Sequence, residues 1–105
     1  MIKYNPDGWV IVKAEHGQMP IYKVFASWDG GCMGSDNWRL NSGITSMKEN
    51  KDYYEFYGYS GNIYNCPKNS EGVLSDDNGQ VLKQLLEQEG VSVISFEDLK
   101  QEFCL

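Results

Sequence analysis

The sequence predicts an α+β fold in which an antiparallel β-meander sheet carries a C-terminal helix–strand–helix packed on one face. Across the first two-thirds of the chain, short runs of β-branched and aromatic residues alternate with turn-forming residues. From Ser75 onward the hydrophobic period lengthens from two residues towards about 3.6, which indicates helix. The chain has 105 residues, 41% of them hydrophobic and 23% charged, so we expect one folded domain over residues 1–105.

The N-terminal segment is expected to form a β-hairpin. Residues 5–8 place a proline and a glycine at positions that suit a type I turn, and the apolar runs 2–4 and 9–14 flank this turn. Alternating apolar residues over 20–28 predict the next strand. The glycine-rich segment 29–36 that follows is interpreted as a loop between strands.

Further short strands are expected before the helical region, over residues 38–40, 44–48, 53–59 and 63–66. In the strand over 53–59, alternation places the odd-numbered side chains on one face. These are Tyr53, Glu55, Tyr57 and Tyr59. Tyr54 and Phe56 should point to the opposite face. Because proline lacks an amide donor, Pro67 should end the last of these strands.

A helix of about ten residues should follow the sheet. Asp77 and Gln80 resemble a capping box at its start, and Gly90 stands where a glycine commonly ends a helix. Its apolar stripe consists of Val81, Leu82, Leu85 and Leu86. The spacing of these residues predicts one buried helix face.

A short strand and a second helix should complete the chain. The apolar run over 91–94 indicates the strand. Ser95 and Asp98 can cap the helix that follows it. The side chains that this helix should bury are Phe96, Leu99 and Phe103.

The formal net charge of −6 is concentrated in one part of the chain. Residues 1–68 hold seven basic and seven acidic residues, whereas residues 69–105 hold two and eight. Such an acidic face repels phosphate backbones, so we do not expect direct binding to nucleic acid. Two interpretations of the acidic helical face stay open. Asp76, Asp77 and Glu87 either present charge to a basic groove on a partner or keep the protein soluble.

No cofactor, metal site or enzymatic activity is expected from the sequence. Cys32, Cys66 and Cys104 lack metal-binding spacing, and His16 is the only histidine. We expect free thiols in a reducing compartment. The chain lacks an apolar run of about 18 residues and the basic-then-apolar layout of a signal peptide, which predicts a cytoplasmic protein that does not bind membranes.

Aromatic residues are concentrated in the predicted sheet, where twelve of the fourteen lie between Tyr4 and Tyr64. Tyrosine, tryptophan and arginine dominate protein-binding hot spots, and a sheet covered by helices on one side leaves its other face exposed. The candidate partner-binding residues are therefore Tyr53, Tyr57, Tyr59, Trp28, Trp38 and Arg39. The same rings could stack nucleobases while Arg39 or Lys51 holds a phosphate, or could stabilise an exposed sheet face.

Two segments in the middle of the chain resemble small accessory proteins encoded by tailed bacteriophages. The first runs from WDGG at residue 28 to WRLNSGI ending at residue 44, and the second covers residues 53–66. The resemblance contains no catalytic motif, so it assigns no functional residue. It implies a role against the machinery or defence systems of a bacterial host.

Two functional hypotheses follow. The first is a phage-encoded, non-enzymatic inhibitor in the host cytoplasm, which binds a host protein such as a nuclease or a CRISPR-type effector through the aromatic sheet surface or the acidic helical face. The alternative is a small-molecule sponge that sequesters a nucleotide signal, held across an oligomer interface such as that of a homodimer. The oligomeric state is left open by the sequence.

Overall fold

The computed structural model describes residues 2–15, 17, 19–28, 37–73 and 75–103. The strands are β1 (Lys3–Tyr4), β2 (Gly8–Ala14), β3 (Ile21–Trp28), β4 (Asn37–Leu40), β5 (Ile44–Glu49), β6 (Tyr53–Gly58), β7 (Ile63–Pro67) and β8 (Val91–Ile94), and the helices are the 3₁₀ turn η2 (Lys68–Ser70), α1 (Asp76–Leu86) and α2 (Phe96–Glu102). These elements confirm the α+β class and the C-terminal helix–strand–helix. The predicted loop 29–36, which includes Cys32, lies outside the described residues, as do His16 and Cys104.

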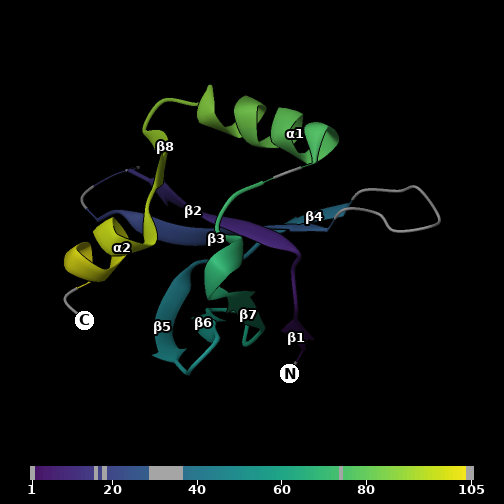
Figure 1. Ribbon diagram of the computed structural model, residues 1–105. Helices are drawn as coiled ribbons and strands as arrows, with labels where there is room; N and C mark the ends of the chain where they lie inside the picture. The colour runs from purple at the N-terminus through teal and green to yellow at the C-terminus, as the bar shows by residue number, and fades with distance from the viewer. Residues whose placement is uncertain (1, 16, 18, 29–36, 74, 104–105) are drawn as a thin grey trace.

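The strands form two four-stranded sheets instead of the one meander that was expected. The strand orders are β1-β7-β6-β5 and β4-β3-β2-β8. The chain passes from one sheet to the other between β4 and β5, where Asn41 donates its amide to the Val24 carbonyl and accepts the Val24 and Gly43 amides with its side chain. Figure 1 shows the two sheets facing each other, with α1 on the far side of β2 and β3. Two apolar sheet faces are buried this way, which one open sheet could not achieve.

The expected N-terminal hairpin is wrong. β1 pairs in parallel with β7, so that Tyr4 lies beside Tyr64, while β2 belongs to the other sheet. Both edges of β2 are already occupied: β3 runs along one edge, and β8 together with a bridge from Trp9 to Gly72 occupies the other. The turn residues that precede β2 therefore connect the two sheets.

The core has two layers, one on each face of the sheet that contains β2. The layer between the sheets joins Trp9, Ile11, Val24 and Ala26 to Phe56, Tyr64 and Cys66, and α2 adds Phe96 and Leu99. The layer beneath α1 joins Val10, Val12 and Phe25 to Val81, Leu82 and Leu85. The helices therefore do not share one face as expected: α1 covers the outside of its sheet, and α2 closes the space between the sheets because its two apolar side chains belong to that core.

The helix caps agree with the sequence in one case and differ in the other. Ser95 caps α2 by accepting the Asp98 amide at 3.1 Å, as predicted. At α1 the N-cap is Ser75, which accepts the Asn78 amide at 3.2 Å, so the capping box expected from Asp77 was placed two residues too late. A helix that begins at Asp76 directs the side chain of Asn78 into the protein. No helix in the described part of the chain is long and apolar enough to cross a membrane.

Candidate functional site

The structure distributes the nine sequence-predicted site residues over five places. Trp28, Trp38 and Arg39 meet beside one pair of sheet edges. Tyr53 and Tyr57 lie on the outer face of β6, away from Tyr54 and Phe56 in the core. Tyr59 lines a separate hollow. Asp76, Asp77 and Glu87 belong to the two ends of α1. The three residues that meet therefore define the candidate site.

The first of these places is a surface hollow of about 370 Å³ lined by Tyr4, Trp28, Asn37, Trp38 and Arg39, which we call the aromatic corner. It lies where β4, the edge strand of one sheet, approaches β1, the edge strand of the other. Tyr4 was not among the sequence-predicted residues. The parallel pairing of β1 with β7 brings it here, and nothing in the local sequence indicates that pairing.

Trp38 and Arg39 line both sides of the β4 edge, because neighbouring residues in a strand point to opposite faces of the sheet. The Trp38 ring stacks on Phe25 with centroids 5.6 Å apart and an angle of 8° between the planes. It is nevertheless 44% exposed. Arg39 turns to the other face, where its guanidinium carbon lies 4.6 Å from the centre of the Tyr4 ring.

Tyr4 and Trp28 are held in place before any partner arrives. The indole nitrogen of Trp28 donates to the Asn5 carbonyl at 3.0 Å, and its ring meets that of Tyr4 edge to face at 6.2 Å. Tyr4 also contacts the Tyr64 ring at 5.0 Å. Rings fixed in this way lose little rotamer freedom on binding, which favours affinity.

Arg39 gives the aromatic corner its charge. It is the only arginine in the sequence. Among the described residues, no carboxylate forms an ion pair with it. Arg39 instead lies beside the aromatic rings of Tyr4 and Tyr64. Burial raises the pKa of Tyr64, whereas the positive charge of Arg39 and its hydrogen bond to Tyr64 lower that pKa. The guanidinium can therefore offer remaining donors to an anionic group on a partner.

Asn78 in α1 holds the backbone segments that carry the aromatic corner. Sequence reasoning missed this residue. Its side-chain nitrogen donates to the Ser27 hydroxyl at 2.8 Å, to the Asn37 carbonyl at 2.7 Å and to the Trp28 carbonyl at 3.3 Å. These bonds tie the end of β3 and the start of β4 to α1. A signal was present, because residue 78 continues the apolar stripe of α1 one turn before Val81, where an asparagine needs buried partners.

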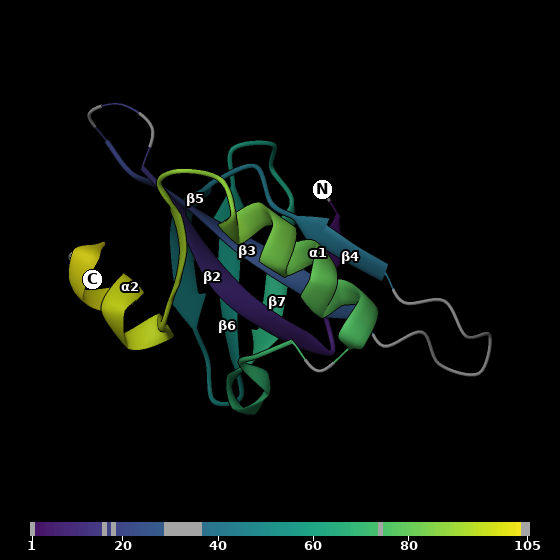
Figure 2. The ribbon, with the colours of Figure 1, turned by 90° about the horizontal axis from the view of Figure 1, so that it is seen from above.

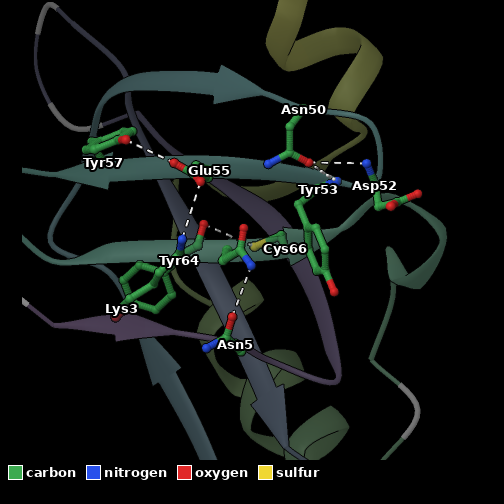
Figure 3. A network of polar contacts seen from close by, with 10 residues as sticks. Lys3, Asn5, Asn50, Asp52, Tyr53, Glu55, Tyr57, Tyr64 and Cys66 are labelled. Atoms are coloured by element: carbon green, nitrogen blue, oxygen red, sulfur yellow. Dashed lines mark hydrogen bonds and ion pairs between the residues drawn. The ribbon is translucent and has the colours of Figure 1, made fainter.

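The tyrosine face of β6 carries a network of polar contacts (Figure 3). Glu55 accepts the Tyr57 hydroxyl at 3.0 Å and pairs with Lys3 at 3.4 Å, and these contacts lower its pKa. Lys48 lies over the Tyr57 ring, 5.7 Å from its centre. Tyr53 is exposed beside this network. The geometry favours the interpretation in which these side chains stabilise an open sheet face.

Tyr59 does not join Tyr53 and Tyr57 as expected. β6 ends at Gly58, and the Tyr59 amide donates to the Gly43 carbonyl at 3.1 Å. The Tyr59 ring packs directly over Gly43, where a Cβ atom would come within 2.8 Å of it. The glycine at this position is what allows the ring to lie there.

Replacing Gly43 with alanine should destabilise the protein by about 2–3 kcal/mol. The backbone φ of Gly43 is +135°, which L-residues rarely adopt, and the new methyl group would also displace the Tyr59 ring. Gly61→Ala is the matched control, since its φ of +89° strains the backbone without any atom near the new Cβ, and should cost about 1 kcal/mol. Urea unfolding would measure both changes. Equal losses would mean that the ring moves aside freely.

The acidic residues of α1 do not form one patch. Asp76 and Asp77 occupy the first turn, and Glu87 caps the other end, about 15 Å away along the helix axis. Negative charge in the first turn offsets the helix macrodipole, so stabilising α1 accounts for both aspartates.

Cys66 lies in the core between the sheets, and burial raises the pKa of its thiol, so it stays protonated at neutral pH. In the described part of the chain, no three His, Cys, Asp or Glu side chains gather closely enough to hold a metal ion.

Comparison with known proteins adds no assignment to this geometry. No protein-family model matches the chain, and neither a curated protein nor a solved structure shows significant similarity to it.

Proposed function

We propose that the protein is a non-enzymatic binding protein that docks on a protein partner through the aromatic corner. The observation that carries the proposal is the pairing of an exposed tryptophan with an arginine that has no carboxylate partner among the described residues, beside two further aromatic rings already fixed in place. Tryptophan, tyrosine and arginine are the residue types that contribute most to protein-binding hot spots.

The corner favours a partner segment with an apolar and an acidic side chain. The open face of Trp38 offers apolar contact, since its other face is covered by Phe25. Arg39 can pair with a carboxylate on the partner. Because the Tyr4 ring would shield this ion pair from water, the attraction between the two charges would be stronger than in water. Inhibition of a host defence protein, the role implied by the phage resemblance, is one specific form of this proposal.

The substitutions Trp38→Ala and Arg39→Glu should each raise the Kd for the partner about tenfold or more. A tagged protein would first recover the partner from bacterial lysate, and calorimetry with the purified pair would then compare the variants. Tyr53→Ala is the matched control, because Tyr53 is an exposed aromatic on the outer face of β6, outside the corner. Unchanged binding by both corner variants, with loss in the control, would assign the partner to the tyrosine face.

A nucleotide ligand is the second candidate, favoured by the same Arg39 beside aromatic rings. A base could stack on Trp38 while Arg39 holds the phosphate. Thermal unfolding with a panel of mononucleotides and cyclic nucleotides distinguishes the two candidates, because a ligand that binds the folded state raises Tm. A rise that Arg39→Glu removes would support the sponge.

A further inference from the structure

A second hollow, of about 400 Å³, lies at the other end of the molecule from the aromatic corner. Met19, Ile21, Tyr59, Glu102 and Phe103 are among the residues that line it, and we call it the Ile21 groove. It is formed by the start of β3, the end of α2 and the turn after β6. Figure 2 shows α2 and β4 at opposite ends of the molecule, so the groove and the corner are separate surfaces.

Several exposed apolar side chains line the groove. Met19 is 76% exposed, Tyr59 73% and Ile21 40%. Isolated exposed apolar residues need no explanation, but a cluster around a concave surface commonly marks a binding site. Phe103 lies beneath them, where its ring packs against Tyr22 with centroids 5.4 Å apart. The groove therefore has an ordered aromatic floor.

One wall of the groove carries the carboxylate of Glu102. Glu102 accepts the Tyr22 hydroxyl at 2.8 Å and the Lys13 ammonium, both with Oε1. Its second oxygen forms no hydrogen bond or ion pair with another described residue. Lys13 is shared with Glu15 at 3.6 Å, so one cation faces two carboxylates. The hydrogen bonds from Lys13 and Tyr22 also lower the pKa of Glu102, which keeps it ionised.

We propose that the Ile21 groove binds a segment of a partner protein that combines an aliphatic side chain with a lysine or arginine. The aliphatic group would lie against Ile21 and Tyr59, and the cation would pair with the second carboxylate oxygen of Glu102. Glu102 lines the groove, and the cluster it forms with Lys13 and Glu15 holds one more carboxylate than cations. This excess and the net charge of −6 both favour a basic segment over an acidic one. The Ile21 groove would select a basic segment, whereas the aromatic corner would select an acidic one, and the groove does not depend on the corner.

The test is an NMR titration of the isotope-labelled protein with three end-capped tetrapeptides. Lys-Leu-Leu-Lys carries both features, Ser-Leu-Leu-Ser removes the charge, and Glu-Leu-Leu-Glu reverses it. The first should shift the amide signals of Ile21, Tyr22 and Tyr59 with a Kd on the order of 1 mM, the second should bind about threefold more weakly, and the third should not bind detectably. Equal binding of all three would leave an apolar site without charge selection and overturn the proposal.

Substitutions test the apolar residues of the groove and its carboxylate separately. Tyr59→Ala and Ile21→Ala should abolish the shifts, whereas Tyr53→Ala, which removes an exposed tyrosine on the outer face of β6 and outside the groove, should leave them unchanged. Glu102→Gln keeps an acceptor for Tyr22 and Lys13 but removes the charge. It should weaken Lys-Leu-Leu-Lys about threefold and leave Ser-Leu-Leu-Ser unaffected. Signals of residues far from the groove show whether each variant is folded.

Two results would contradict the proposal directly. No shift at the groove with any peptide would show that it is not a docking site. Groove signals that move with protein concentration alone, without peptide, would show that a second copy of the chain occupies it. Both outcomes are independent of the corner, because the variants Trp38→Ala and Arg39→Glu should leave the groove titration unchanged.

Discussion

Replacement of Trp9 with alanine is expected to remove about 5 kcal/mol of folding stability and to leave most of the chain unfolded at 25 °C. Trp9 is completely buried at the centre of the layer between the sheets. Its ring meets those of Phe56 at 5.7 Å, Tyr54 at 5.9 Å and Phe96 at 6.4 Å, so it joins β2, β6 and α2. Far-UV circular dichroism and urea unfolding would measure the loss.

The hydrogen bond of Trp9 can be separated from its packing. The indole nitrogen donates to the Pro67 carbonyl at 2.7 Å, so alanine would leave both a cavity and an unpaired acceptor. Trp9→Phe keeps most of the ring contacts and loses the donor, and should cost about 2 kcal/mol. Trp38→Ala is the matched control and should cost about 1 kcal/mol, because Trp38 is partly exposed. Comparable losses at Trp9 and Trp38 would contradict the central place of Trp9 in the core.

The strands were predictable from short runs of β-branched and aromatic residues, and some of them also from the alternation of side chains along the chain. β6 illustrates this: Tyr54 and Phe56 reach the core, and Tyr53 and Tyr57 do not. The change of period near Ser75 likewise indicated α1, and the Ser95 cap indicated the start of α2. Local side-chain patterns suffice for elements of this kind, since each depends on residues only a few positions apart.

The assignment of strands to sheets was not predictable in the same way. β1 and β7 pair across about sixty residues, and β2 pairs with β8 across an even longer separation. Their apolar residues indicate strands but not partners. The two-sheet arrangement depends on the burial of both faces of β2. One face packs against α1 and the other against the sheet that contains β6, so this burial exists only in the folded protein.

Part of the candidate site was predicted, but its residues lie in a different place from the one expected. Trp28, Trp38 and Arg39 were chosen for their residue type, and the structure brings them together. They were expected beside the tyrosines of β6, but those tyrosines belong to the other sheet. Tyr4 and Asn78 were missed because each reaches the corner through a contact between segments distant in the sequence.

Replacement of Asn78 is the second change with a large expected effect. Asn78→Ala would leave the carbonyl groups of Trp28 and Asn37 without this donor, and should cost about 2–3 kcal/mol. Gln80→Ala is the matched control, since Gln80 is exposed on the same helix, and should change stability by less than about 0.5 kcal/mol. Urea unfolding compares the two directly. Equal effects at the two positions would mean that these bonds do not hold α1 to its sheet.

Asn78→Asp tests the same contacts through charge. The aspartate has nearly the shape of asparagine, but its carboxylate would face two carbonyl oxygens in a buried site, so we expect a loss of about 3–4 kcal/mol at pH 7. Burial should raise the folded-state pKa of this aspartate above its unfolded value of about 3.9. The penalty should therefore shrink as the pH falls through the raised pKa, because the protonated side chain can again donate. A penalty that does not change between pH 7 and pH 4 would mean that the side chain has turned to solvent. Binding at the aromatic corner would then be expected to weaken as well, since Asn37 and Trp28 would no longer be held by α1.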